Sequence, residues 1–329
     1  MTTTLSEEFA DALERIGIKR AAAMAAHAEV RAHLELDPKL TEWGVDTILI
    51  GSYARKTAIH PCHDVDVFVK LPSCQETNPE TVFAEVRRVL VAAYGDRASE
   101  QRRSMCIRGF GANLSVDAVP AVAYQSHWQI PQTGTQQFGG RWLKDRWEHT
   151  DPEQLTELTH RMQERGPSVA GNHAYIRIVR FIKQIRDTQL GPAKPGGLYV
   201  ELLTYWAFAE GVVGNSYAEL LAATLSSIAS QLSSGATVIE PAMDAAYSPA
   251  PDPGAISAAA LSFSGIAAEA RRALTLETCP AAAAWRRMLG QNANGWVFPL
   301  PQGCDELGRT VTPLHATPDL GPQRARPFA

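Results

Sequence analysis

Two aspartates separated by a single residue stand in the segment GSYARKTAIHPCHDVDVFV, residues 51–69. If the DVDV stretch is a β-strand, Asp64 and Asp66 lie on one face, because successive strand side chains point to opposite faces. Two carboxylates about 6 Å apart repel by about 1 kcal/mol in water and roughly 3 kcal/mol at an effective dielectric of about 20. A solvated strand face would tolerate that repulsion, so the DxD pattern alone does not establish a functional site.

A third acid lies on a later apolar segment. The stretch LSVDAVPAV, residues 114–122, predicts a short strand that carries Asp117. If this strand lies beside the DVDV strand, three carboxylates meet at one end of a sheet. Such a set suits two divalent cations about 3.5 to 4 Å apart, one activating an attacking hydroxyl and one holding a triphosphate. A single acid near a strand end is the alternative.

Gly51 and Ser52 fit a phosphate-binding turn. A glycine lets the backbone approach a phosphate closely, and a serine at a helix start offers its hydroxyl and nearby N–H groups to an anion. The pair means little by itself. Its significance comes from the order of the predicted elements, which runs strand, Gly-Ser turn, short helix, DxD strand and then a third acid on a later strand.

The elements that must position these residues form two differently built halves. Residues 5–35 predict an Ala-rich helix. Short apolar segments predict strands at 45–51, 64–71, 104–110 and 114–122, with a helix at 79–95. After about residue 150 only helical patterns follow, at about 152–165, 171–189, 197–212, 217–233, 256–274 and 280–290. We therefore expect three parts: a sheet lobe (1–150), an all-helical lobe (151–298) and a Pro-rich, extended or flexible tail (299–329).

The composition is that of an ordinary globular protein of about two domains, with 329 residues, 45% hydrophobic and 20% charged. The 31 Lys and Arg against 35 Asp and Glu give a net charge of −4, so there is no global basic field for nucleic acid. No run of 18 apolar residues occurs, and the acidic N-terminus is unlike a signal peptide. These features predict a cytoplasmic protein without a membrane segment.

The five cysteines are scattered: Cys62, Cys74, Cys106, Cys279 and Cys304. Their odd number and the absence of a CxxC pair argue against a disulfide framework and against a structural zinc site. The stretch HPCHD around Cys62 lacks the second ligand cluster that a zinc site needs.

The acidic segments resemble a known superfamily. GSYARKTAIHPCHDVDVFV followed by VDAVPAV is similar to the nucleotidyltransferases of the DNA polymerase beta superfamily, in the branch of oligoadenylate synthetase, cyclic GMP-AMP synthase and the bacterial CD-NTases. WEHTDPEQLTELT, YIRIVRFIKQIRD, GGLYVELLTYWAFAEG, APDPGAISAAAL and AWRRMLG resemble segments of their second lobe. The resemblance spans about residues 40–290. It implies an α+β fold in which a nucleotidyltransferase sheet lobe faces an all-helical, oligoadenylate synthetase-like lobe, with the active site in the cleft between them.

The same resemblance implies roles for the residues of the motif. Asp64, Asp66 and Asp117 become catalytic ligands of two Mg²⁺ ions, with Mn²⁺ as an alternative, and Asp117 lies near the attacking hydroxyl. Gly51 and Ser52 become the phosphate-binding turn.

Three further residues are candidates for nucleotide binding. Lys183 in RFIKQIRD corresponds to a triphosphate contact, although an exposed helix lysine is the alternative. Arg55 would add positive potential after the phosphate turn, unless it belongs to a solvated helix end. Where the family often carries a serine and an aromatic residue, this chain has Gly197 and Leu198. Tyr199 is then either a base-stacking platform or a core tyrosine.

The activity implied is template-independent nucleotidyl transfer that makes a cyclic di- or trinucleotide second messenger from ATP, with GTP, CTP or UTP as further substrates. By the same resemblance the product would act on a downstream effector in bacterial antiphage signalling of the CBASS type. The C-terminal tail, which ends in RPFA, would accept a conjugating or regulatory partner. An RNA- or protein-directed nucleotidyltransferase and a noncatalytic nucleotide-sensing scaffold remain as alternatives, although the net charge of −4 disfavours a nucleic-acid substrate.

Overall fold

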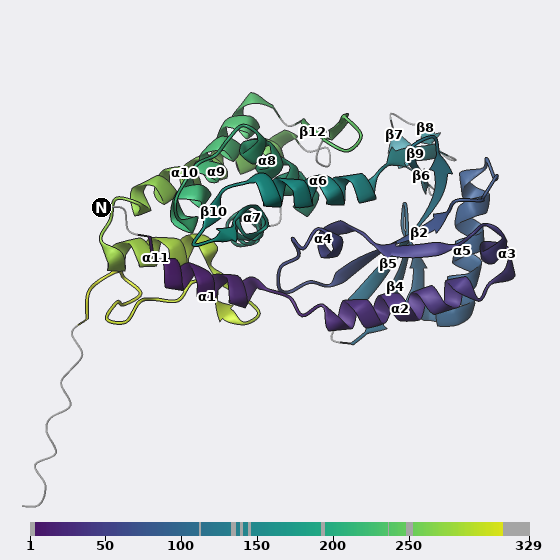
Figure 1. Ribbon diagram of the computed structural model, residues 1–329, viewed down its shortest axis with the longest axis horizontal. Helices are drawn as coiled ribbons and strands as arrows, with labels where there is room; N and C mark the ends of the chain where they lie inside the picture. Colours follow the sequence, from purple (N-terminus) through teal and green to yellow (C-terminus); the bar gives the residue numbers. More distant parts are fainter. Residues whose placement is uncertain are drawn as a thin grey trace, which may run out of the picture.

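The protein consists of a sheet lobe and a helical lobe arranged along one long axis (Figure 1). The computed structural model describes residues 4–111, 113–132, 136–138, 141–143, 146–191, 195–235, 237–247 and 253–311. In Figure 1 the sheet lobe, in purple and blue, lies to the right, and the helical lobe, in teal to yellow, lies to the left.

The sheet lobe is built on a seven-stranded mixed sheet with the central order β1-β2-β5-β4-β3, in which β6 also pairs with β5, and β9 pairs with β6. Its strands are β1 (Asp46–Leu49), β2 (Asp64–Leu71), β3 (Ala98–Glu100), β4 (Met105–Phe110), β5 (Leu114–Tyr124), β6 (His127–Gln132) and β9 (Arg146–Thr150). The pair β2 and β5 is parallel, whereas the other strand pairs of this sheet are antiparallel. All four strands expected from the sequence are confirmed.

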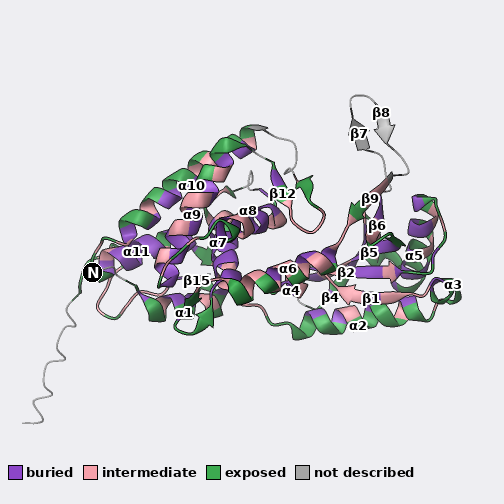
Figure 2. Ribbon diagram, turned by 45° about the horizontal axis from the view of Figure 1, so that its top comes forward, coloured by how far each residue is buried: buried purple, intermediate pink, exposed green. Residues whose placement is uncertain are grey.

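The alternation of β2 divides its side chains between a core and a cleft. Val65, Val67 and Val69 are fully buried in the core, against α2 (Ala21–Glu35) and α5 (Pro79–Tyr94). Figure 2 shows the exposed side of α2 turned outward and its buried side toward the sheet. The other face of β2 carries the two aspartates, as the alternation predicts.

The predicted helix over residues 5–35 is wrong in extent, because two helices form there. The first is α1 (Ser6–Ile16), which ends at Gly17, and α2 begins only at Ala21. Phe9 of α1 packs among aromatic rings of the helical lobe, with ring centroids 5.2 Å from Trp285 and 5.0 Å from Phe298. Helix α1 therefore contributes to the core of the helical lobe although it precedes the sheet lobe in the sequence.

The helical lobe contains the six predicted helices: α6 (Pro152–Arg165), α7 (Tyr175–Gln189), α8 (Gly197–Ala209), α9 (Tyr217–Ser234), α10 (Pro253–Ala273) and α11 (Thr278–Leu289). The expectation of a purely helical half is wrong, since short antiparallel hairpins connect some of these helices. They are β10 (Ser168–Val169) with β11 (Asn172–His173), β12 (Val238–Glu240) with β13 (Ala245–Tyr247), and β14 (Gln291–Asn292) with β15 (Gly295–Trp296). Two- and three-residue strands are too short for an alternation pattern to reveal them.

Smaller elements complete the chain. They are α3 (Pro38–Glu42), α4 (Gly51–Ala54), η1 (Gly95–Arg97), β7 (Gln136–Phe138) and β8 (Arg141–Leu143). No helix within the described ranges is long and apolar enough to cross a membrane.

A disulfide joins Cys279 of α11 to Cys304, with Cα atoms 5.1 Å apart. The expectation that no disulfide forms is therefore wrong. The chain returns over α11 after residue 298, which brings together two cysteines whose spacing carries no recognisable pattern. The N–H of Val311 donates to the carbonyl of Gly303 at 2.7 Å. The described part of the predicted tail, residues 299–311, is thus folded back and not extended, while residues 312–329 lie outside the described residues.

Candidate active site

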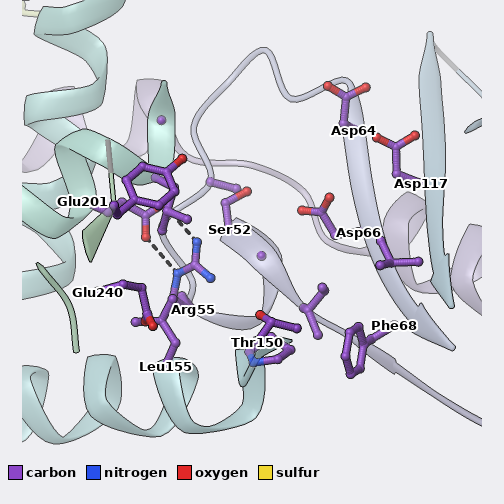
Figure 3. Close-up of a pocket in the computed structure, with 18 of the residues that line it drawn as sticks. Ser52, Arg55, Asp64, Asp66, Phe68, Asp117, Thr150, Leu155, Glu201 and Glu240 are labelled. Carbon is purple, nitrogen blue, oxygen red and sulfur yellow. Dashed lines mark hydrogen bonds and ion pairs between the residues drawn. The ribbon is translucent and has the colours of Figure 1, made fainter. Parts of the chain in front are cut away.

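The acidic residues meet on two adjacent strands. In the parallel β2–β5 pair, Asp66 lies directly opposite Asp117, and Asp64 lies opposite Ser115. The Ser115 hydroxyl donates to the Asp64 carboxylate at 2.6 Å. Figure 3 shows the three aspartates together, with Asp66 between Ser52 and Asp117. The predicted adjacency of the two acidic strands is confirmed.

The environment of Asp66 and Asp117 favours their protonated forms. Burial, and next the charge of Asp66, raises the pKa of Asp117 to about 6. Burial also raises the pKa of Asp66, and the neighbouring Asp64 adds to this, although Arg55 opposes it. One oxygen of Asp117, Oδ1, is buried without a hydrogen-bond partner. These groups are thus held in an arrangement that costs free energy unless a proton or a cation offsets it.

The acids do not form a ready cluster of metal ligands. Within the described residues no three His, Cys, Asp or Glu side chains are gathered closely enough to hold a metal ion. The chemistry of the set nevertheless fits a hard divalent cation, which prefers oxygen ligands. Two adjacent carboxylates with raised pKa values and one unpartnered buried oxygen are groups that a cation would stabilise.

The Gly51–Ser52 turn lies directly against these acids. Gly51 begins α4 with φ 64°, and a Cβ atom there would lie 2.0 Å from Oδ2 of Asp66. Only glycine therefore fits, because a side chain would meet both an unfavourable backbone conformation and the carboxylate. The N–H of Ile50 donates to the backbone carbonyl of Asp66 at 3.0 Å, which fixes the turn over β2.

A buried group of three charges joins the two lobes beside this turn. Arg55 of the sheet lobe donates from Nε to Glu201 of α8 at 2.8 Å, and Lys183 of α7 pairs with the same carboxylate. Lys183 also donates to the carbonyl of Thr57 at 3.2 Å. All three charged residues are only 5–6% exposed. Lys183 and Arg55 are therefore neither exposed helix residues nor solvated helix ends, and the predicted cations do lie at the cleft.

Glu201 was not singled out from the sequence. Burial opposes its ionisation, but the charges of Arg55 and Lys183 lower the pKa of Glu201 to about 2. Burial lowers the pKa of Lys183, and the Glu201 charge opposes that shift. The sequence did hold a signal, because Glu201 is the one charged residue within the apolar helix GLYVELLTYWAFA.

The three charges and the acids line one cavity of about 1000 Å³ between the lobes. Asp64, Asp66 and Asp117 contribute from the sheet, and Gly51, Ser52 and Arg55 from the phosphate turn and α4. Lys183 and Glu201 contribute from the helical lobe. Among the residues described, this cavity therefore brings together seven of the eight predicted site residues.

Tyr199 is the exception, and its assignment as a base-stacking platform is wrong. Its side chain is 1% exposed, and the residue does not line the cavity, whereas its neighbours Gly197 and Leu198 do. The tyrosine that lines the cavity, among the residues described, is Tyr247 of β13. Since consecutive helix positions are rotated by about 100°, a one-residue displacement turns the ring from the cleft into the core.

Two adjacent acid-bearing strands, a glycine turn held against them and a helical lobe across a cavity define a nucleotidyltransferase fold and site. Residues 1–162 match the model of the SMODS family, the Second Messenger Oligonucleotide or Dinucleotide Synthetase domain. Residues 1–162 thus belong to this family of nucleotidyltransferases, which confirms the resemblance to the bacterial CD-NTases noted in the sequence.

Solved structures share this fold over most of the chain. CdnG of Bradyrhizobium diazoefficiens, in complex with GTP, is 14% identical with a TM-score of 0.68, covering 86% of this chain and 94% of its own. CdnC of Escherichia coli MS115-1 with ATP is 16% identical with a TM-score of 0.67, covering 87% and 98%. DncV of Escherichia coli, in its 3'-deoxy GTP bound form, is 13% identical with a TM-score of 0.60, covering 88% of each chain. No curated protein sequence matches the chain.

Proposed function

We propose that this protein joins nucleoside triphosphates without a template into a cyclic di- or trinucleotide second messenger. The observation that carries the proposal is the register that sets Asp66 beside Asp117, against the Gly51–Ser52 turn, in a cavity of about 1000 Å³. That volume is at the upper end of the range of about 300 to 1,000 Å³ for small-molecule sites, as a donor and an acceptor nucleotide together require. The complexes of CdnG with GTP and CdnC with ATP support NTPs as substrates.

In the proposed reaction, a ribose hydroxyl of one nucleotide attacks the α-phosphorus of a second. The new O–P bond forms, the bond from the α-phosphorus to the bridging oxygen breaks, and pyrophosphate leaves. The hydroxyl proton passes to water, and Asp117, whose buried Oδ1 has no hydrogen-bond partner, would lie near that hydroxyl. Gly51 and Ser52 bind the triphosphate, and Lys183 and Arg55 supply positive charge beside it.

Asp64, Asp66 and Asp117 would hold two Mg²⁺ ions, with Mn²⁺ as an alternative. When bound, such ions supply charge neutralisation at the phosphates and lower the pKa of the attacking hydroxyl.

The product would act on a downstream effector in CBASS-type antiphage signalling. The tail beyond residue 311 would accept a conjugating or regulatory partner, so removal of the last ten residues should leave nucleotide synthesis intact in vitro. A large loss of synthesis would contradict that separation.

The test is incubation of the pure protein with labelled ATP, GTP, CTP and UTP and Mg²⁺, followed by mass spectrometry. Short, phosphatase-resistant oligonucleotides are expected, and Asp66→Asn should abolish them. Long phosphatase-sensitive chains or labelled protein would indicate an RNA- or protein-directed transferase instead. Nucleotide binding without any product, also in the presence of Mn²⁺, would favour a nucleotide-sensing scaffold.

A further inference from the structure

Tyr247 lines the cavity with an aromatic ring that packs on a second, buried tyrosine ring. It ends the β12–β13 hairpin of the helical lobe, is half-buried and lines the cavity. Its ring stacks on that of Tyr199, with centroids 6.5 Å apart and planes inclined by 29°. Since Tyr199 is 1% exposed, Tyr247 rests on a ring that the core immobilises. Flat heterocycles such as nucleobases stack on aromatic side chains of this kind.

The sheet lobe supplies an apolar surface to the same cavity. Phe68 and Val119 line it two positions beyond Asp66 and Asp117, and they lie opposite each other in the β2–β5 pair. At about 3.3 Å per strand residue, this surface lies about 6 to 7 Å from the carboxylates. Ile130 of β6 extends it. Figure 3 shows Phe68 further along the strand from Asp64 and Asp66. In a nucleotide the base likewise lies one ribose away from the α-phosphate.

A polar pair stands at the same part of the cavity. Arg103 and Glu148 line it and form an ion pair, with Nη2 of Arg103 2.5 Å from the carboxylate. Burial raises the pKa of Tyr247, which lines the same cavity, and the charges of Arg103 and Glu148 also act on it. Nε of Arg103 is buried and has no hydrogen-bond partner. The N–H at this atom is a donor that still lacks an acceptor.

We propose that Tyr247 is the stacking platform for a nucleobase and that Arg103 contacts the edge of that base. This proposal rests on the proposed function and adds the base subsite to it. An N–H donor matches the keto oxygens of guanine and uracil, whereas the amino groups of adenine and cytosine would present a second donor at the same position. The subsite therefore favours GTP and UTP over ATP and CTP.

The test measures binding to the full chain by calorimetry with Mg²⁺. The probes are nonhydrolysable analogues of the four NTPs, and inorganic tripolyphosphate, which has no base. Tyr247→Ala should weaken nucleotide binding by about 5- to 150-fold, as expected when base stacking is lost. It should leave tripolyphosphate binding unchanged. Tyr247→Phe keeps the ring and should bind nucleotides within about twofold of the parent, as a retained stack implies.

Two further variants separate stacking from packing. Tyr247→Leu preserves apolar contact with Tyr199 but has no flat ring, so it should also lose nucleotide affinity, and it serves if the alanine variant does not fold. Tyr205→Ala removes another half-buried tyrosine that does not line the cavity, and it should bind nucleotides normally. A third variant, Arg103→Met, tests the edge contact and should bring the affinities for GTP and ATP together.

The outcomes are distinct. Equal affinity of Tyr247→Ala and the parent for nucleotides, or an equal loss of nucleotide and tripolyphosphate binding, would overturn the stacking role. A preference for GTP and UTP that survives in Arg103→Met would overturn the edge contact. If the parent protein binds none of the four nucleotides, the proposed function itself fails.

Discussion

Replacing Asp117 by asparagine should make the metal-free protein more stable at neutral pH. Burial and the adjacent Asp66 raise the pKa of Asp117 from 3.8 to about 6. The folded state therefore binds a proton more tightly than the unfolded state, and the free energy of unfolding decreases as the pH rises from about 4 to about 6. Above about pH 6 Asp117 is mostly ionised in the folded state, and the full free-energy cost of its buried charge lowers the stability. A rise from 3.8 to about 6 corresponds to at most about 3 kcal/mol, and partial solvent screening reduces this to about 1 to 3 kcal/mol.

The assay is urea unfolding in EDTA, followed by circular dichroism at pH 8 and at pH 4.5. Asp117→Asn should be more stable than the parent by about 1 to 3 kcal/mol at pH 8 and by only about a third of that at pH 4.5, because the folded parent carboxyl is then protonated while the unfolded one, with a pKa of 3.8, is mostly ionised. Asp64→Asn is the matched comparison and should give a smaller gain, since Asp64 is exposed, adds a lesser part of the repulsion, and asparagine keeps an acceptor for the Ser115 hydroxyl. A variant that is no more stable than the parent at pH 8 would refute the reasoning that these acids are held in a costly arrangement.

Three further predictions follow from the packing. Glu201→Gln leaves two buried cations without their counter-charge and should lower the free energy of unfolding by about 3 to 5 kcal/mol. Glu306→Gln removes the charge of an exposed partner of Arg286 and should change the free energy of unfolding by less than about 1 kcal/mol. Equal effects of the two variants in urea unfolding would contradict this. Gly51→Ala should destabilise the protein and abolish nucleotide synthesis, while Gly265→Ala, in open space within α10, should be neutral or stabilising by up to about 1 kcal/mol in the same unfolding assay. Replacing both Cys279 and Cys304 by serine opens a loop with a sequence separation of 25 and should lower stability by about 3 to 4 kcal/mol. An unchanged unfolding midpoint in non-reducing buffer would show that this bond is not formed in solution.

Local patterns predicted the parts of the site that depend on one element at a time. The alternation of DVDV assigned Asp64 and Asp66 to one face, because the pleat of a strand sends every second side chain the same way. Helical periodicity and strand-length apolar segments likewise predicted the central strands and the six helices of the second lobe. These features depend on residues a few positions apart, so the sequence alone determines them.

Only the tertiary structure decided which residues meet across the chain. The pairing of Asp66 with Asp117 depends on the register of two strands, and the burial of Lys183 depends on Glu201 and on Arg55 in the other lobe. That Tyr247 lines the cavity while Tyr199 is buried depends on how the β12–β13 hairpin packs on α8. Such contacts are set by the packing of the whole core. The free energy of that packing is shared among residues far apart in the chain, so no short segment encodes it.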